Sequence, residues 1–170
     1  MDRATFVYVT YIAAKPEAVW KGLLDGEFTR QYWAHENVSD WKPGSPWEHR
    51  RTDAARTVDI LGEVLEAEPP RRLVMTWAYP KDKGRRDRCS RVTFEIEQVA
   101  EMARLTVTHD DLAFDPDMGR KISEGWPRVL SSLKSLLETG RPLDTWAGRD
   151  QIEKSDGHPA PRDLKIHVGD

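Results

Sequence analysis

The sequence predicts an α+β fold in which a curved antiparallel sheet of about six to seven strands wraps around one long C-terminal helix. Apolar and polar residues alternate through most of residues 47–111, which predicts strands with one dry face and one wet face. Residues 124–138 instead carry apolar side chains at helical spacing along one side. Two short helical stretches, joined at a glycine, follow the first strand.

The first elements are predicted from local residue preferences. Residues 5–12 are β-branched or aromatic and predict a strand. Pro16 is a favourable first helical residue, and the helix it begins ends at Asp25-Gly26. A second short helix is predicted from Glu27 to Trp33.

The strands that follow are bounded by turn residues. They are predicted, in order, at residues 38–41, 47–51, 57–68, 71–79, 90–99 and 102–111. Gly62 lies in the middle of the longest strand, where it predicts a bulge or bend of the kind that turns curved sheets. The charged segment 81–88 predicts a solvated hairpin loop with Gly84 near its tip.

The last helix is predicted to begin near residue 117, after an Asp-Pro pair, and to end at Gly140. Pro127 has no amide N–H to donate to the Ser123 carbonyl, so a break or bend is predicted at residues 123–127. A straight helix meets a curved sheet well along one line only. Side chains must therefore fill the remaining space, or a cavity remains between helix and sheet.

Composition excludes several classes of function. The 170 residues carry a net charge of −3, which offers no electrostatic attraction for nucleic acid or an anionic membrane. No apolar run approaches the roughly 20 residues of a membrane helix. The single cysteine, Cys89, excludes an internal disulfide, favours a cytoplasmic location and is interpreted as an ordinary strand residue. We expect one domain at 1–140 and a polar extension at 141–170, flexible or loosely docked.

Seven tryptophans indicate aromatic walls inside this domain. His49 and Arg51 share the phase of Trp47, so they line an aromatic pocket suited to a carboxylate or hydroxyl if that side faces inward, and are solvated if the strand lies at an edge. His109 is a candidate ligand contact or general base, or else a histidine paired with a neighbouring aspartate or water. The predicted ligand-binding residues are Trp33, Trp47, His49, Arg51, Trp77, Phe94, His109, Trp126 and Leu130.

The motifs of common enzymes are missing from the sequence. It contains no Gly-x-Ser-x-Gly, Walker or dinucleotide-binding motif. His109, Asp110 and Asp111 are consecutive on a strand, so their side chains alternate and do not converge on a metal ion. Glu95 and Glu97 fall on the wet face. We expect no catalytic residue, no metal and no cofactor.

Four stretches resemble a known family: GEVLEAEPPRRLVMTWAY, SRVTFEIEQV, RLTVTHDDL and SEGWPRVLSSLKSLLETG. They are similar to bacterial proteins grouped with the C-terminal domain of the activator of the heat-shock-protein-90 ATPase, within the START-like or SRPBCC superfamily. KPEAVWKGLLDGEFTRQYW fits the opening strand and helix pair of that family. The resemblance covers about residues 5–140 and implies the helix-grip fold, but its motifs are structural and name no catalytic group.

Three functions are expected from this resemblance. The first is a non-enzymatic binder of a small hydrophobic or aromatic molecule in a cavity between the sheet and the C-terminal helix. The second is a chaperone-regulating interaction module, and the third is a cyclase/aromatase-like enzyme that uses the same cavity. As partners we expect this ligand and a weak protein partner, without nucleic acid or membrane, and a chain that is a monomer or a homodimer.

Overall fold

The fold is an antiparallel sheet bent around a long helix, seen in a computed structural model that describes residues 4–144. Strand β1 (Phe6–Ile12) is followed by helices α1 (Pro16–Leu24) and α2 (Gly26–Trp33), and the last described element is helix α3 (Pro116–Thr139). The strands between are β2 (His35–Val38), β3 (Pro46–Arg51), β4 (Val58–Glu68), β5 (Arg72–Trp77), β6 (Ser90–Val99) and β7 (Met102–Asp110). Two 3₁₀ turns, η1 (Pro80–Asp82) and η2 (Arg86–Arg88), connect β5 to β6.

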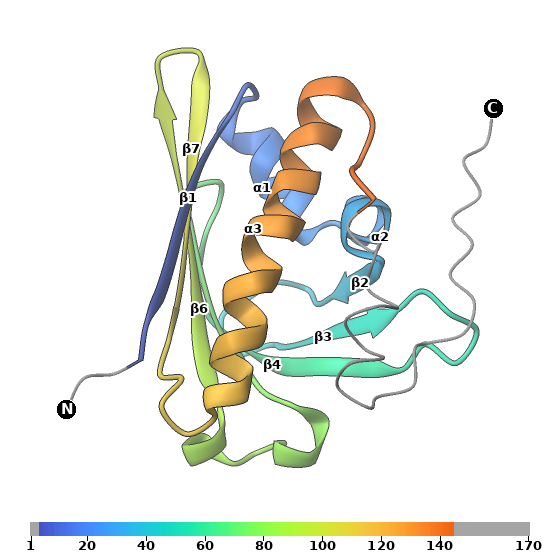
Figure 1. The fold of residues 1–170 in the computed structure, drawn as a ribbon, viewed down its shortest axis with the longest axis vertical. Coiled ribbons are helices and arrows are strands. Elements are labelled where there is room, and N and C mark those ends of the chain that lie inside the picture. Colours follow the sequence, from blue (N-terminus) through green and yellow to red (C-terminus); the bar gives the residue numbers. More distant parts are fainter. Residues whose placement is uncertain (1–3, 145–170) are drawn as a thin grey trace.

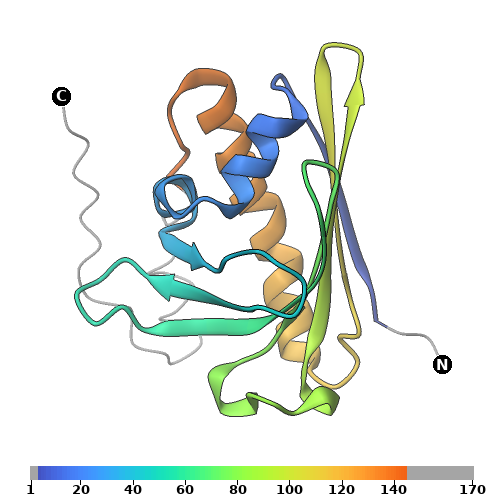
Figure 2. The same cartoon turned by 180° about the vertical axis from the view of Figure 1, so that it is seen from behind.

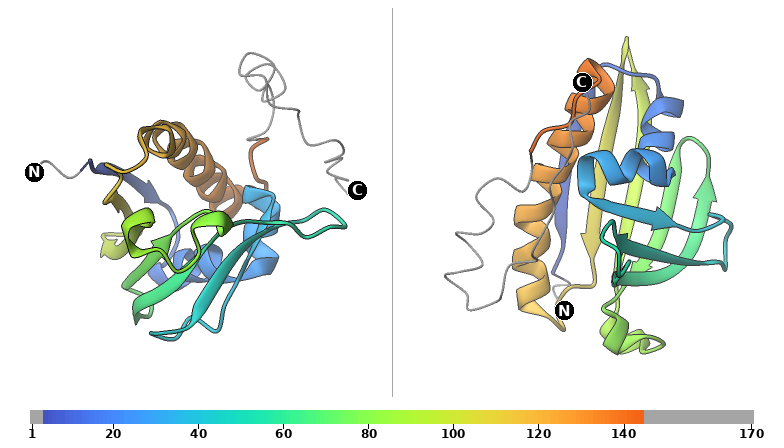
Figure 3. Two further views of the ribbon diagram at one scale, coloured as in Figure 1. Left: turned by 90° about the horizontal axis from the view of Figure 1, so that it is seen from below. Right: turned by 90° about the vertical axis from the view of Figure 1, so that its right-hand side faces the viewer.

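The seven strands form one sheet in the order β1-β7-β6-β5-β4-β3-β2, and neighbouring strands are antiparallel. Strands β1, β7 and β6 run along the molecule, whereas β3 and β4 run across them (Figure 1). Seen from below, the sheet curves around α3 (Figure 3). The predicted helix-grip fold, with its curved sheet and two short helices after the first strand, is confirmed.

The change of direction falls within β4. Its pairing with β3 ends at Glu63, and its pairing with β5 begins at Val64. Gly62 lies beside this point, and a Cβ atom there would lie 2.0 Å from the Thr76 carbonyl oxygen and 2.6 Å from Trp47 Nε1. The Trp47 indole N–H donates to that same carbonyl at 2.8 Å. The bend predicted near Gly62 is therefore present, and the glycine allows the backbone of β5 and the Trp47 side chain to approach closely.

The three helices cover the concave side of the sheet (Figures 1 and 2). Helix α1 packs against α3 at Gly22, where an added Cβ would lie 2.8 Å from a methyl carbon of Leu133. Helix α2 packs on α1 through the Tyr32 hydroxyl, which donates to the Gly22 carbonyl at 2.9 Å. This close contact places the end of α2 beside the middle of α3.

Alternation along the strands sends the predicted side chains inward. Val92, Phe94 and Val107 are buried, as their phase predicts. Glu95 and Glu97 lie on the outer face, where Arg72 and Arg104 pair with them. A strand with one wet and one dry face thus places its residues as the sequence pattern indicates.

The second strand lies earlier than predicted. We expected it at residues 38–41, but β2 covers His35–Val38. Ala34 adopts a left-handed conformation with φ 55°, so the chain leaves α2 and enters the sheet without a connecting loop. Residues 39–42 lie in no strand, and there the Ser39 hydroxyl accepts from the Trp41 backbone N–H at 2.9 Å.

The predicted break at Pro127 is not found, because α3 is one continuous helix from Pro116 to Thr139. Proline removes one backbone hydrogen bond and costs about 3 kcal/mol inside a helix. Trp126, Leu130 and Leu133 surround this position and are buried in the core. Their burial holds the helical backbone on both sides of the proline, and each contributes about 1.5–3 kcal/mol.

The chain beyond residue 144 lies outside the described residues, and with it most of the extension expected at 141–170. Within residues 4–144, none of the helices has the length and apolar character needed to cross a membrane.

The segment 81–88 contains the two 3₁₀ turns rather than a simple hairpin loop, and Asp82 within it is buried.

Replacement of Asp115 by alanine is expected to lower the free energy of unfolding by about 1 kcal/mol, the usual value of a helix N-cap. The Asp115 carboxylate accepts from the Met118 backbone N–H at 3.1 Å and caps the first turn of α3. Urea denaturation measures the change. Asp117→Ala is the matched control, because this exposed aspartate pairs only with nearby side chains and should matter less. Equal losses in the two variants would contradict the capping role.

Candidate functional site

An aromatic cluster fills the interior where α2, α3 and strands β3, β5, β6 and β7 meet. Trp33 and Trp126 lie 5.4 Å apart, and Trp77 and Trp126 lie 5.5 Å apart, measured between ring centroids. Each ring is at most 7% exposed. We define the aromatic cluster by its seven members, Trp33, Trp47, His49, Trp77, Phe94, His109 and Trp126.

Local structure explains why these residues converge. Trp47 and His49 are two positions apart on β3 and therefore share its inner face. Trp77 is the last residue of β5 and His109 is the second-last residue of β7, and both lie on the same side of the sheet. Trp126 lies in the middle of α3, opposite them. Residues from four elements remote in sequence, β3, β5, β7 and α3, thus meet because the bent sheet carries β3 toward the long helix.

Two surface hollows lie outside the aromatic cluster. One of about 360 Å³ lies beside the β5–β6 connection, where Leu65, Cys89 and Phe114 line it. The other, of about 560 Å³, lies near the start of α1, beside Arg72 and Arg104. Neither hollow has a member of the aromatic cluster in its wall. In this conformation the rings of the cluster contact one another.

His109 is paired on both ring nitrogens. The Trp126 indole N–H donates to His109 Nδ1 at 3.1 Å. Because an indole nitrogen can only donate, Nδ1 is the acceptor, and the neutral ring carries its proton on Nε2. His109 Nε2 therefore donates to the Ser90 hydroxyl at 2.7 Å, and that hydroxyl in turn donates to the Trp77 carbonyl at 3.3 Å.

This direction of hydrogen bonding opposes catalysis by the Ser90–His109 pair. A nucleophilic serine needs a histidine nitrogen that accepts its proton. Here the facing nitrogen is already protonated, and its tautomer is set by Trp126. Burial lowers the pKa of His109 to about 4, so the ring is neutral at physiological pH. The observed partners of His109, Trp126 and Ser90, differ from the partners that the sequence suggested, which were Asp110, Asp111 or water.

A second series of polar residues, linked by hydrogen bonds and ring stacking, reaches the cluster from its other side. His49 Nδ1 donates to the Asn37 side-chain oxygen at 2.6 Å. The His49 ring stacks on His35 with centroids 4.0 Å apart and planes within 4°. His35 bonds through Nε2 to Asp59 at 2.8 Å, and Arg51 donates to the same carboxylate at 2.7 Å. Buried His49 is thereby linked to the half-exposed Arg51–Asp59 ion pair.

The environment lowers the pKa values of His49 and Asp59. Burial holds the pKa of His49 well below its ordinary value, and neighbouring His35 lowers it further against the opposing attraction of Asp59. Burial alone would raise the pKa of Asp59, but hydrogen bonds from His35 and Arg51 outweigh it and lower that pKa to about 2. His49 is therefore a neutral ring beside an ionised carboxylate.

Trp77 differs from its neighbours in one respect. Trp47 Nε1 donates to a backbone carbonyl and Trp126 Nε1 donates to His109. Trp77 Nε1 is buried and has no acceptor among residues 4–144. Buried polar groups are almost always paired, so an unpaired donor here is unusual. The cluster therefore holds a fully buried hydrogen-bond donor whose partner is not supplied by residues 4–144.

The structure brings eight of the nine predicted residues into the buried interior. Leu130, one helical turn from Trp126, is fully buried on the same face of α3. Arg51 is the exception, because its side chain is 40% exposed and is held by Asp59 at the strand end. A register irregularity between His49 and Arg50 separates it from the phase of the preceding residues.

Three polar partners escaped the sequence prediction: His35, Asn37 and Ser90. His35 and Asn37 are two positions apart on β2 and both face inward. They were missed because the strand was predicted at residues 38–41. Ser90 shares the phase of Val92 and Phe94 on β6, and this alternation could have identified it. Small polar residues give no signal of their own, because most of them lie at the surface.

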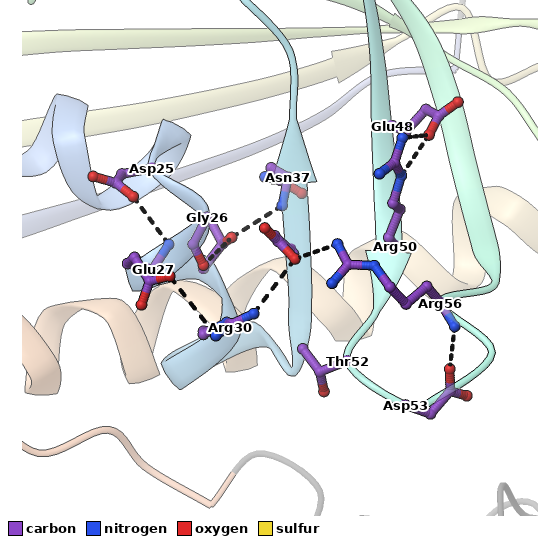
Figure 4. Close-up of polar contacts among 12 residues, drawn as sticks. Asp25, Gly26, Glu27, Arg30, Asn37, Glu48, Arg50, Thr52, Asp53 and Arg56 are labelled. Carbon is purple, nitrogen blue, oxygen red and sulfur yellow. Dashed lines mark hydrogen bonds and ion pairs between the residues drawn. The ribbon is translucent and has the colours of Figure 1, made fainter.

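A charge cluster joins α2, β2 and the β3–β4 hairpin outside the aromatic cluster (Figure 4). The Glu36 carboxylate accepts from Arg56 at 2.5 Å and from Arg30 at 3.5 Å. Arg50 pairs with Glu48 on the same hairpin. Because each of these arginines already has a carboxylate partner, they stabilise the hairpin rather than form a site for an anion.

Cys89 and the metal-ligating residue types offer no further site. Burial raises the pKa of the Cys89 thiol, which favours the unreactive protonated form. Among residues 4–144, no three histidine, cysteine, aspartate or glutamate side chains are grouped to hold a metal ion.

A profile of the protein family described as activator of Hsp90 ATPase homolog 1-like protein matches residues 13–138. The chain belongs to this family. The matched range extends from the end of β1 through nearly all of α3 and includes the whole aromatic cluster. The resemblance seen in the sequence is thereby confirmed.

Solved structures of other proteins share the fold. CalU16 from Micromonospora echinospora is 18% identical with a TM-score of 0.65, covering 90% of this chain and 84% of its own. Protein MLL2253 from Mesorhizobium loti is 25% identical with a TM-score of 0.64, covering 78% and 96%. An Hsp90 activator from Plasmodium falciparum is 21% identical with a TM-score of 0.58, covering 91% and 97%. No curated protein sequence matches the chain.

Proposed function

We propose that this family member is a receptor for a small hydrophobic or aromatic molecule, bound within the aromatic cluster between the sheet and α3. The observation that carries the proposal is the buried Trp77 indole N–H without an acceptor. A ligand that supplies the acceptor removes the free-energy cost of this unpaired donor. The proposed contacts are Trp33, Trp47, His49, Trp77, Phe94, His109, Trp126 and Leu130, with Arg51 acting through Asp59 and His35.

Binding at this position requires the rings to move apart, because they touch in the conformation described. Trp33 is the last residue of α2, next to the left-handed Ala34, and Trp126 contacts it from α3. Separation of these two rings would open the cluster between two helices. The apparent association constant is then the constant for the open conformation multiplied by the fraction of molecules that are open.

The indole N–H resonances of the tryptophans test this proposal. Titration with naphthalene, followed by two-dimensional NMR, should give saturable shifts at Trp33, Trp77 and Trp126. Trp20 is the internal control, since it lies on α1 outside the aromatic cluster and its signal should stay in place. Shifts confined to Trp20, or no saturable shift with any neutral aromatic compound, would exclude an interior binding site.

A receptor role is favoured over a cyclase-like enzyme by the histidines. His109 donates to Ser90 rather than accepting its proton, and His49 donates to Asn37, so neither histidine activates a nucleophile within residues 4–144. We place the protein in the cytoplasm because of its single cysteine.

Chaperone regulation is a second candidate, favoured by the family description and by the Hsp90 activator among the similar structures. Its test is the ATPase rate of a purified Hsp90-type chaperone with and without this protein. Stimulation that saturates with protein concentration supports the candidate, and an unchanged rate without detectable binding removes it.

A further inference from the structure

We propose that the ligand of the aromatic cluster is a neutral aromatic molecule with a hydroxyl group, which accepts a hydrogen bond from Trp77 Nε1 and donates one to His49 Nε2. The inference rests on the proposed receptor function and names its ligand class. It starts from the Trp77 indole N–H, which is buried without an acceptor, and from the second ring nitrogen of its neighbour His49.

Several other polar atoms in and around the cluster are paired. Trp47 Nε1 donates to a carbonyl, and both nitrogens of His109 are paired. The Tyr32 hydroxyl donates to a carbonyl of α1. Trp77 Nε1 is the fully buried donor of the cluster that has no acceptor within residues 4–144. The hydrogen bond of His49 to Asn37 uses Nδ1, which leaves Nε2 for a ligand.

The state of His49 follows from Asn37. The Asn37 amide nitrogen donates to the Leu23 carbonyl at 3.4 Å, which turns its oxygen toward His49. His49 Nδ1 must then carry a proton to donate to that oxygen at 2.6 Å. In the neutral ring, Nε2 is consequently an acceptor. Burial and the stacked His35 ring keep His49 neutral.

One ligand can meet both atoms. The Trp77 and His49 rings lie 6.1 Å apart between centroids, and Trp33 and Trp126 provide aromatic surfaces beside them. A hydroxyl both accepts and donates, whereas an ether only accepts and an ammonium group only donates.

The same geometry decides between the two ligand groups that the sequence left open, a carboxylate and a hydroxyl. A buried carboxylate needs a cation beside it. The aromatic cluster contains no lysine or arginine among the described residues, and Arg51 is directed to Asp59 at the strand end. A charged carboxylate is therefore disfavoured, and the neutral hydroxyl is the group that fits.

A matched series of naphthalenes tests this inference on the unaltered protein: 2-naphthol, 2-methoxynaphthalene, naphthalene and 2-naphthoate, each titrated by calorimetry. We expect 2-naphthol to bind about tenfold more tightly than 2-methoxynaphthalene, which can accept from Trp77 but cannot donate to His49, as one additional hydrogen bond allows. Naphthalene, which makes neither hydrogen bond, should bind more weakly than the ether, and 2-naphthoate should bind most weakly. The Trp77 indole proton should move downfield with 2-naphthol, because hydrogen bonding deshields it.

Two variants make the assignment specific. Trp77→Phe removes the donor and keeps an aromatic ring, so the preference for 2-naphthol over naphthalene should fall several-fold. Trp20→Phe is the control and should leave the preference unchanged. If Trp77→Phe does not fold, the ligand series on the unaltered protein still decides.

The outcomes separate this inference from the receptor proposal. Equal binding of naphthalene and 2-naphthol overturns the hydroxyl assignment and leaves the receptor function in place. Preferred binding of 2-naphthoate also overturns it. Failure of all four compounds to bind overturns both proposals.

Discussion

Replacement of Gly62 by alanine is expected to lower the free energy of unfolding by about 3 kcal/mol or more, as for severe overpacking. The added Cβ would lie 2.0 Å from the Thr76 carbonyl oxygen, which is a backbone atom and cannot rotate away. It would also lie 2.6 Å from Trp47 Nε1, which donates to that same oxygen. The substitution therefore separates β4 from β5 and releases Trp47, the ring that anchors the bent part of the sheet.

Gly119→Ala is the matched control for this prediction. Gly119 lies in α3, and nothing is within 4 Å of the position that its Cβ would occupy. Alanine there should raise stability by about 0.5–1 kcal/mol, because glycine has the lower helix propensity. Urea denaturation of the two variants measures both changes. A Gly62→Ala protein within about 1 kcal/mol of the unaltered one would show that the contact does not hold the bend.

Acidification from pH 7.5 to 5.0 is the second large effect, and we expect His109 alone to lower the free energy of unfolding by about 2 kcal/mol. The pKa of His109 is about 4 in the folded protein, against an ordinary value of 6.5. Below pH 6.5 His109 binds a proton in the unfolded chain but stays neutral in the folded protein, so the free energy of unfolding falls as the pH falls. The loss levels off once the pH passes below the folded pKa of about 4.

Burial lowers the pKa of His109 against the attraction of Asp110, and the geometry of the Trp126 bond is also unfavourable to a second proton. A second proton on His109 would have to go on Nδ1, where the Trp126 N–H already points at it. His49 adds a loss of the same sign, since its pKa is also lowered by burial. Asp59, with its pKa lowered to about 2, stabilises the fold above pH 3.8 and loses this contribution only below that value, so it does not change the result between pH 7.5 and 5.0.

His109→Gln tests the assignment, because glutamine carries a donor and an acceptor but does not titrate. The variant is expected to be less stable at pH 7.5 and to lose about 2 kcal/mol less than the unaltered protein on acidification. Equilibrium urea unfolding at the two pH values measures this difference. The same pH dependence in both proteins would mean that His109 does not cause the acid sensitivity.

Much of the fold follows from short-range patterns in the sequence. The alternation in residues 90–99 and 102–110 predicts which side chains of β6 and β7 face inward. Pro16 and Gly140 mark helix ends where the structure has them. Predictions failed where tertiary contacts outweighed a local preference. The break predicted at Pro127 is absent, because burial of the flanking residues keeps the helix continuous.

By itself, the sequence determined the order of the elements, the bend at Gly62 and the inward direction of most of the tryptophans. These properties depend on residues within a few positions of one another, and side-chain direction repeats with a period of two or 3.6. The tertiary structure alone decided that the rings touch, that Trp126 sets the tautomer of His109, and that Trp77 lacks an acceptor. Each of these depends on distances between residues remote in the chain, which no local pattern encodes.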